Sequence, residues 1–524
     1  MRAAGVLLSA ALAAVAVAGD LLVRVEPKSD ADIETATTLN ASFLGRFDGW
    51  FLARVRTEEL ATLSGRLGCR VLDADIESKR YVYAFVEPGF DRQRLAGCGV
   101  VLTEDREGVL LRTTEAGIKE MNGLPVELCG VSTEPVLSSP TPNPQAPTSS
   151  SVPDSLIWQL MARASQDSAE AVLRRLIAFH TRYAYTESCW SAARWYQTKL
   201  AAYDCDTTYL DTFDAALGPN VIGLKRGRAN PNQVYIVCGH IDDASEMPET
   251  FAPGSDDNAS GAGLVLEVAR ILADMDFDYT VWFIGFGGEE QGLVGSESFA
   301  RRCRERGDTL VLAINHDMDS YGTAGRDSIR VVGKRTDPPC STWVEYYMAM
   351  ADTFTDLKCH REIVDDQGSS DQHSFWDYGY TAIRDRYLDI DPVYHTTGDT
   401  IGPFEYVMCG TNNIPMYTEA IKATVATVAK LAGAHQHVGI EESPEPQATS
   451  PRLTVAPSVG LAPVSIRLSS VADVSVYNTA GRLIRILSGS ALVWDGCDFS
   501  GAAASPGVYH FRAAGASARF VLAR

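Results

Sequence analysis

Five short motifs between residues 239 and 400 carry imidazole and carboxylate side chains of the kinds that bind metal ions and transfer protons. Each motif follows a strand-like apolar run or opens a helical pattern. Neutral imidazole and carboxylate are ligands that zinc accepts in proteins. The motifs therefore predict a zinc site, provided that the fold brings them together. They are Gly239-His240-Ile241-Asp242, Gly254–Gly261, Gly287–Ser296, Asn315-His316-Asp317-Met318 and Tyr394–Thr400.

The first two motifs are ambiguous when each is taken alone. His240 follows a buried strand-like run, and Asp242 can orient the imidazole of His240 by accepting its other ring proton. Asp256 and Asp257 precede a helical pattern, where carboxylates commonly act as caps. A carboxylate that bridges two metal ions needs the same kind of loop, so this pair of aspartates is also a candidate for metal binding.

The remaining motifs supply the other groups that a hydrolytic site needs. Of the two neighbouring glutamates, Glu289 and Glu290, one can bind a metal while the other, unligated, takes a proton from a metal-bound water. We expect Asp317 and His395 to be further ligands, and the hydroxyl of Tyr394 to stabilise a developing oxyanion. His316 should point away from Asp317 if this segment is extended.

In this order the motifs resemble those of the co-catalytic double-zinc aminopeptidases related to the Vibrio and Streptomyces leucine aminopeptidases. The resemblance covers about residues 155–435 and implies two zinc ions per chain that share Asp257. It implies His240, Asp257 and Asp317 as ligands of one ion, and Glu290, His395 and Asp257 as ligands of the other. It further implies that Asp242 supports His240, and that Glu289 is the general base for hydrolysis of N-terminal residues by a metal-bridging hydroxide.

Other activities are compatible with the same scaffold. A carboxypeptidase would need a basic pocket, which Arg384 or Arg386 could supply, and a glutaminyl cyclase of this lineage works with one zinc. A non-catalytic surface binding protein is the alternative from another functional class. The segment Ser370–Trp376 departs from the family pattern by one extra residue between Asp371 and His373, so we interpret His373 as structural or substrate-lining.

The alternation of strand and helix patterns over residues 155–435 predicts an α/β domain with a mostly parallel mixed sheet flanked by helices, of the zinc exopeptidase type. In such sheets reactive residues gather at the carboxyl ends of strands. Strands are predicted at Val234–Cys238, Tyr279–Ile284 and Leu310–Ile314, and helices at Ala262–Met275 and Ser296–Arg306.

The segments on either side of this domain predict further units. Residues 19–130 read as a small α+β accessory or propeptide-like domain, with a helix over Thr57–Leu67. Residues 131–154, rich in Pro, Ser and Thr, and residues 436–450 are predicted linkers. Residues 451–524 have an all-β pattern that resembles the Ig-like C-terminal sorting domains of exported bacterial proteins, which implies contact with secretion machinery.

The N-terminus and the composition indicate an exported protein. Arg2, the apolar run Gly5–Ala16 and the small residues Ala16-Val17-Ala18 have the pattern of a signal peptide over residues 1–18. We therefore expect a secreted or cell-surface protein with no transmembrane segment in the mature chain, and the family resemblance implies peptide substrates. A net charge of −21 over 524 residues opposes a nucleic-acid partner. Export permits disulfides among the eleven cysteines, whose pairing the spacing does not define.

Overall fold

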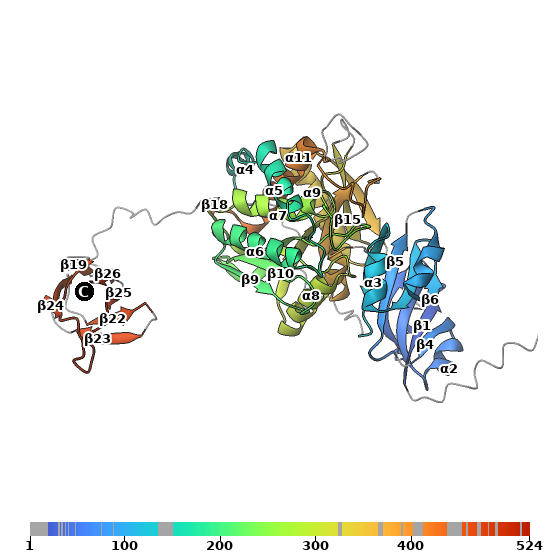
Figure 1. Ribbon diagram of the computed structural model, residues 1–524, viewed down its shortest axis with the longest axis horizontal. Helices are drawn as coiled ribbons and strands as arrows, with labels where there is room; N and C mark the ends of the chain where they lie inside the picture. Colours follow the sequence, from blue (N-terminus) through green and yellow to red (C-terminus); the bar gives the residue numbers. More distant parts are fainter. Residues whose placement is uncertain are drawn as a thin grey trace, which may run out of the picture. The chain divides into compact units, whose positions relative to one another are not determined.

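A computed structural model describes most of residues 19–134, 150–322, 327–364, 370–401, 412–436 and 453–523 (Figure 1). The predicted signal peptide and most of both predicted linkers lie outside the described residues. The chain divides into two compact units, Met1–His437 and Val438–Arg524.

The first unit is built around a mixed eight-stranded sheet with the order β16-β15-β17-β14-β11-β13-β10-β9. Its middle strands β17, β14, β11 and β13 run parallel to one another, and β10 joins β13 antiparallel. The predicted mostly parallel mixed sheet is confirmed. The strands are β9 (Thr207–Asp211), β10 (Asn220–Lys225), β11 (Asn230–His240), β13 (Tyr279–Phe286), β14 (Thr309–His316), β15 (Ser328–Lys334), β16 (Lys358–Val364) and β17 (Ala382–Tyr387).

Helices enclose this sheet and bury its apolar strands in one core. Helix α7 packs on β11 and against α5 and α11, while α8 contacts α10. The helices of this domain are α4 (Asp154–Met161), α5 (Gln166–Ile177), α6 (Glu187–Ala202), α7 (Ala259–Ile271), α8 (Val294–Arg306), α9 (Pro338–Phe354), α10 (Gln372–Asp377) and α11 (Ile414–Ala432). A two-stranded ribbon of β12 (Met275–Asp276) and β18 (His435–Gln436) completes it.

The three predicted strands lie within β11, β13 and β14, and each observed strand is longer than its prediction. The helix predicted over Ala262–Met275 is α7, which begins and ends earlier. Its start is set by Asn258, whose side-chain oxygen accepts a hydrogen bond from the Gly261 backbone N–H at 2.7 Å. The predicted end at Met275 was wrong, because Met275 begins β12.

The N-terminal part contains two antiparallel four-stranded sheets, in the orders β2-β3-β1-β4 and β6-β7-β5-β8. Trp50 and Tyr83 belong to a shared core between the two sheets. The helix predicted over Thr57–Leu67 is shorter than expected, as α2 (Leu60–Ser64). The other elements are β1 (Asp20–Glu26), β2 (Ser42–Phe47), β3 (Trp50–Arg56), β4 (Gly68–Ala74), β5 (Arg80–Val86), η1 (Arg92–Gly97), β6 (Gly99–Glu104), β7 (Gly108–Thr113), α3 (Glu115–Met121) and β8 (Val126–Val131).

The second unit is all-β in its described residues, with sheet orders β19-β21-β24 and β20-β26-β25-β22-β23 around the buried Trp494. Its strands are β19 (Leu453–Ala456), β20 (Val459–Gly460), β21 (Val464–Leu468), β22 (Val474–Asn478), β23 (Leu483–Leu487), β24 (Ala491–Trp494), β25 (Gly507–Ala513) and β26 (Ala516–Leu522). In the part of the chain that the structure describes, no helix has the length and apolar character needed to cross a membrane.

Candidate metal centre

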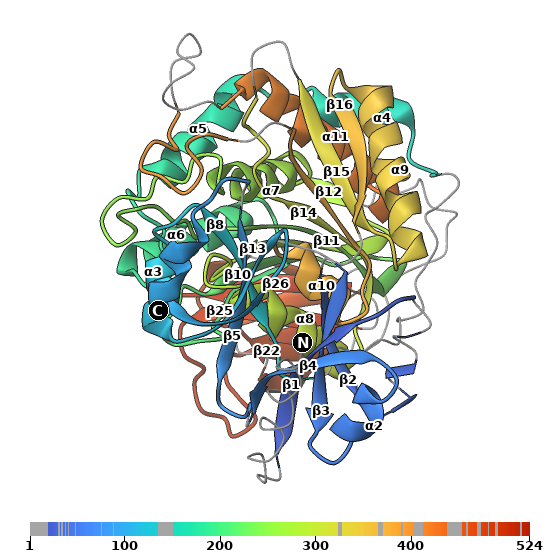
Figure 2. The same cartoon turned by 90° about the vertical axis from the view of Figure 1, so that its right-hand side faces the viewer.

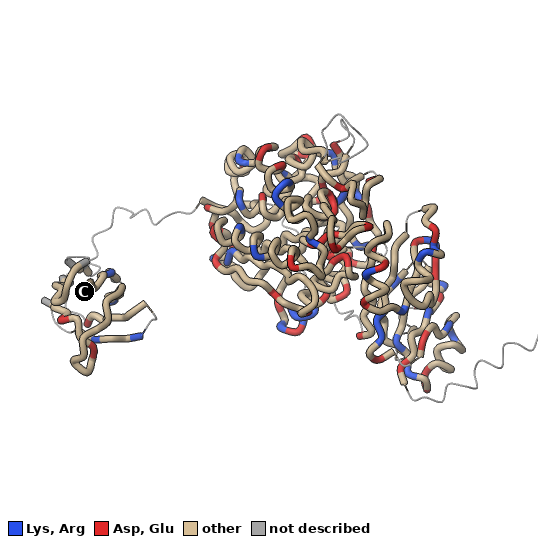
Figure 3. Tube along the Cα trace, in the orientation of Figure 1, with Lys and Arg blue, Asp and Glu red and all other residues tan. Residues whose placement is uncertain are grey.

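The central sheet gathers three of the five motifs at one edge. His240 is the last residue of β11, Glu289 and Glu290 follow β13, and Asp317 follows β14. Because these strands are parallel neighbours, their carboxyl ends meet at the same edge of the sheet. Figure 3 shows acidic positions concentrated on the side of the central domain that faces the N-terminal sheets.

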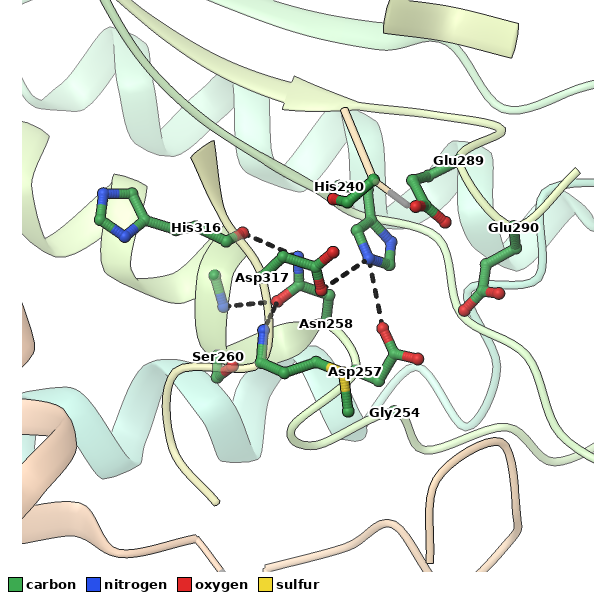
Figure 4. Close-up of polar contacts among 12 residues, drawn as sticks. His240, Gly254, Asp257, Asn258, Ser260, Glu289, Glu290, His316 and Asp317 are labelled. Atoms are coloured by element: carbon green, nitrogen blue, oxygen red, sulfur yellow. Dashed lines mark hydrogen bonds and ion pairs between the residues drawn. The ribbon is translucent and has the colours of Figure 1, made fainter. Parts of the chain in front are cut away.

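The first histidine lies between two carboxylates. His240 Nε2 is 3.2 Å from Asp257 Oδ1 and 3.4 Å from Asp317 Oδ1 (Figure 4). Asp257 reaches this position from the loop in front of α7. Both aspartates predicted to share a zinc ion with His240 therefore lie next to its Nε2 atom.

The second histidine contacts the other oxygen of the same aspartate. His395 Nε2 is 3.1 Å from Asp257 Oδ2 and 2.9 Å from Glu290 Oε2. The carboxylate of Asp257 thus presents one oxygen to each histidine, the arrangement that a ligand shared by two metal ions requires. His395 comes from the loop after β17, more than one hundred residues after Asp257 in the sequence.

The ligand atoms also form groups that differ from the predicted sets. His240, Glu289 and Asp317 have ligand atoms that all lie within 4.8 Å of one another, and so do His240, Asp257 and Glu290. Glu289, predicted as the unligated base, is thus as close to this centre as the predicted ligands. In Figure 4 its carboxylate lies beside His240 and Glu290.

All of these side chains are buried, with exposed fractions of 5% or less. Burial raises the pKa of Glu290 to about 7, although His395 opposes this shift, and burial likewise raises the pKa of Glu289. Burial alone would raise the pKa of Asp257 too, but hydrogen bonds from His240 and His395 hold it well below its usual range. Carboxylates outnumber imidazoles here, so the buried cluster has an excess of negative charge that cations would neutralise.

Two atoms at the centre of the cluster test whether a metal fits. Glu290 Oε1 is buried and has no hydrogen-bond partner among the described residues, and His395 Nε2 lies against two carboxylate oxygens, those of Asp257 and Glu290. Buried polar atoms are normally paired, and unpaired ones require an explanation such as an ion. An imidazole nitrogen and carboxylate oxygens that point to one place are a donor set suited to zinc.

Asp242 has a different partner from the one we expected. Its two carboxylate oxygens accept hydrogen bonds from the backbone N–H groups of Glu289 and Glu290, each at 3.2 Å. His240 Nδ1 instead lies 3.2 Å from the backbone carbonyl oxygen of Asp242, and 3.8 Å from its carboxylate. The side chain of Asp242 therefore fixes the glutamate pair, while its backbone contacts the imidazole.

Two further residues contact the predicted ligands, and these contacts were not predicted from the sequence. The carboxylate of Asp399 accepts the backbone N–H groups of Asp256 and Asp257. Arg384 Nη2 lies 3.1 Å from Asp317 Oδ2, and its Nη1 lies 3.4 Å from Glu127 Oε1. The signal for Asp399 was its place in the same motif as His395, whereas nothing local to Arg384 predicts its contact with Asp317.

The other candidates lie around this centre. The ring of Tyr394 stacks on that of His395, with centroids 3.8 Å apart, and Tyr394 also lines a cavity of about 780 Å³. His316 points away from Asp317, as expected, and its Nδ1 lies 2.6 Å from Asp385 Oδ1. His373 is outside the cluster, with its Nε2 3.6 Å from Asp377. Asp371 is buried, and its pKa is raised to about 7 by burial against the opposing effect of His240.

Known proteins share this central segment. Residues 220–411 match the family model described as Peptidase family M28. A probable zinc metalloprotease of Pyrenophora teres f. teres is 28% identical over 192 residues, which is 32% of this chain and 41% of that protein. Aminopeptidase YwaD of Bacillus subtilis is 29% identical over 204 residues, which is 37% of this chain and 42% of that protein.

The chain therefore has metallo-aminopeptidase homologues of the M28 type, and it spans less than half the length of these two relatives. Among solved structures, the LapA aminopeptidase of Legionella pneumophila superposes with a TM-score of 0.53 at 17% identity. That match covers 68% of this chain and 98% of LapA, and it supports the fold.

Proposed function

We propose that this protein is an exported two-zinc aminopeptidase that hydrolyses N-terminal residues from peptides. The observation that carries the proposal is the position of Asp257 between His240 and His395, with one carboxylate oxygen at 3.2 Å from the first imidazole and the other at 3.1 Å from the second. His240, Asp257 and Asp317 would hold one zinc ion, and Asp257, Glu290 and His395 the other.

When bound, the zinc ions would polarise the scissile carbonyl and lower the pKa of a water. Glu289 is buried beside the ligands, and burial raises the pKa of its carboxyl. A carboxylate with a raised pKa is a stronger base, so Glu289 would take a proton from the attacking water and pass it to the leaving amine. Asp242 would keep Glu289 in position through the backbone N–H that it accepts.

Arg384 supports the choice of an aminopeptidase over a carboxypeptidase. A carboxypeptidase needs a cation that is available to the terminal carboxylate of its substrate. The guanidinium of Arg384 lies between the carboxylates of Asp317 and Glu127, within 3.4 Å of both. These two carboxylates already engage it.

We further propose that the second unit directs export to the cell surface. Its support is the all-β architecture of the described residues together with the signal-peptide pattern at residues 1–18 and the resemblance to sorting domains. Fusion of residues 438–524 to a periplasmic reporter, followed by fractionation of the cells, tests this role. A reporter that stays in the periplasm would contradict it.

The activity is tested with leucine-p-nitroanilide and with two forms of one short peptide. One form is blocked at its N-terminus and the other at its C-terminus. We expect release of p-nitroaniline that a chelator abolishes and that zinc restores. We also expect cleavage of the C-terminally blocked peptide and none of the N-terminally blocked one. The reverse preference would indicate a carboxypeptidase, cyclisation of N-terminal glutamine without hydrolysis would indicate a cyclase, and a zinc-loaded protein with neither activity would indicate a binding protein.

A further inference from the structure

The N-terminal part of the chain reaches the candidate metal centre through the connection between α3 and β8. In Figure 2 the N-terminal sheets, in blue, lie in front of the central sheet. Four residues of this part contact the central domain: Asn122, Leu124, Glu127 and Gly130. They bring a unit that the sequence suggested as an accessory or a propeptide into direct contact with the loops that carry the ligands.

Asn122 joins the two parts with its whole amide group. The side chain is fully buried, and its nitrogen donates to the backbone carbonyl oxygen of Glu290. Its oxygen accepts from Gln291 Nε2 at 3.1 Å and from the Tyr183 hydroxyl at 3.2 Å. A buried amide is costly unless it is paired, so partners on both of its atoms indicate an interface matched in detail.

The backbone of Leu124 contacts the second ring nitrogen of His395, whereas the central domain itself makes the equivalent contact with His240. His395 Nδ1 lies 3.2 Å from the backbone carbonyl oxygen of Leu124. The corresponding atom of His240 lies 3.2 Å from the carbonyl oxygen of Asp242, within its own domain. A histidine that binds a metal usually donates its other N–H to such an acceptor, which fixes the ring and its tautomer.

Glu127 and Gly130 extend the interface on either side. Glu127 pairs with Arg384, the residue that also contacts Asp317. The backbone N–H of Gly130 donates to the carbonyl oxygen of Gly292 at 3.1 Å, and a Cβ at position 130 would lie only 2.5 Å from that oxygen. The loop that follows Glu290 therefore needs a glycine opposite it.

The two parts leave an open cavity between them. The cavity of about 780 Å³ has walls from both parts. Met318, Arg384 and Tyr394 line it on the central side, next to the ligands Asp317 and His395, and Phe85, Pro125 and Glu127 line it on the N-terminal side. A volume of this size accommodates a small peptide.

We propose that the N-terminal domain is a working part of the catalytic site: Asn122, Leu124 and Gly130 hold His395 and the Glu290 loop for the second metal ion, and the domain forms one wall of the peptide-binding cavity. This proposal rests on the proposed two-zinc function. It means that the domain stays with the enzyme and supports its activity.

The test uses the full chain with three single substitutions. Gly130→Ala inserts a methyl group into the contact with Gly292, and Asn122→Ala removes the buried amide. Gly68→Ala in β4 is the matched control, because it adds the same methyl group to another strand glycine of this domain, where the nearest neighbour, Glu26 Cβ, is at 3.7 Å. Zinc affinity is measured by competition with a graded series of chelators, and the fold by circular dichroism and thermal unfolding.

In the two interface variants, we expect one of the two zinc ions to bind at least about tenfold more weakly, the usual effect of losing outer support of a ligand, while the other ion is unchanged. The KM for a tripeptide should rise in both variants, and Gly68→Ala should match the wild type. Unchanged zinc affinities in folded Gly130→Ala and Asn122→Ala, or a gain of activity, would overturn the proposal, since a gain would mean that the domain inhibits. A wild-type protein without zinc or activity would instead contradict the proposed function itself.

Discussion

Asp399 Oδ2 accepts a hydrogen bond from the backbone N–H of Asp257 at 3.0 Å, while Asp399 Oδ1 accepts from Asp256 at 2.8 Å. The loop that carries His395 therefore also fixes the backbone of the residue proposed to bridge the two metal ions. The contact spans 142 positions of sequence. It couples the positions of two ligands through one carboxylate.

Replacing this carboxylate should loosen the metal centre. In Asp399→Asn an NH₂ group replaces one carboxylate oxygen. This group faces a backbone N–H and cannot accept a hydrogen bond from it. We expect zinc affinity to fall at least about tenfold, with kcat recovered at high zinc concentration. Chelator competition measures the affinity, and Asp167→Asn, at an exposed aspartate of α5, is the control. Equal affinities in both variants would refute this role.

Glu289→Gln should remove the general base and leave the metal bound. We expect turnover to fall at least about a hundredfold, because the amide cannot take a proton. Zinc content, measured by elemental analysis, should stay at two per chain. Glu305→Gln, at an exposed glutamate of α8, should behave as the wild type. Should the Glu289 variant lose a zinc ion, the side chain would be a ligand, as its distance to His240 and Asp317 permits.

Asp257 and the histidines should differ in how many zinc ions they affect. In Asp257→Asn the binding of both zinc ions should weaken, because the carboxylate lies next to both histidines. We expect each affinity to fall by more than about a hundredfold, which is the upper end of the effect of removing a residue that only supports a ligand. His240→Ala and His395→Ala should each release one ion first. Zinc content at graded chelator concentrations distinguishes these patterns. Retention of one ion at wild-type affinity in Asp257→Asn would mean that this residue does not bridge.

The N-terminal domain should lose stability in acid through Asp73. Its carboxylate accepts from Tyr81 Oη, Lys79 Nζ and Arg112 Nη1 at 2.9, 3.1 and 2.8 Å. Burial alone would raise the pKa of Asp73, but hydrogen bonds from Lys79 and Arg112 lower it. A pKa lower in the folded than in the unfolded state stabilises the fold above the unfolded value of about 4, and this stability is lost as the pH falls through the folded value.

Asp73→Asn should therefore destabilise the domain at pH 7 by about 1–3 kcal/mol, the usual range for hydrogen bonds to a charged group. The difference from the wild type should shrink at pH 3. Urea unfolding at the two pH values measures it, and exposed Asp167→Asn again serves as control. An equal difference at both pH values would show that the ionised form of Asp73 is not what stabilises the fold.

Several features could be predicted because they are local. The predicted strands ended shortly before His240, Glu289 and Asp317 and so placed these residues at strand ends, and parallel pairing then brings strand ends together. Helix limits were less accurate. The predicted end of α7 was wrong because Met275 joins β12, where its partner Gln436 lies far away in the chain. No periodicity within the helix encodes that pairing.

The chemical kind of the site could be predicted from the sequence alone: which side chains could bind zinc, that one of two neighbouring glutamates could act as a base, and at which strand ends they stand. These properties follow from residue type and from local periodicity, which neighbouring residues encode. Three contacts became visible only in the folded chain: the carboxylate of Asp242 supports Glu289, Arg384 lies between Asp317 and Glu127, and Leu124 contacts His395. Such contacts join segments that are distant in the chain, and they depend on how whole sheets pack against one another.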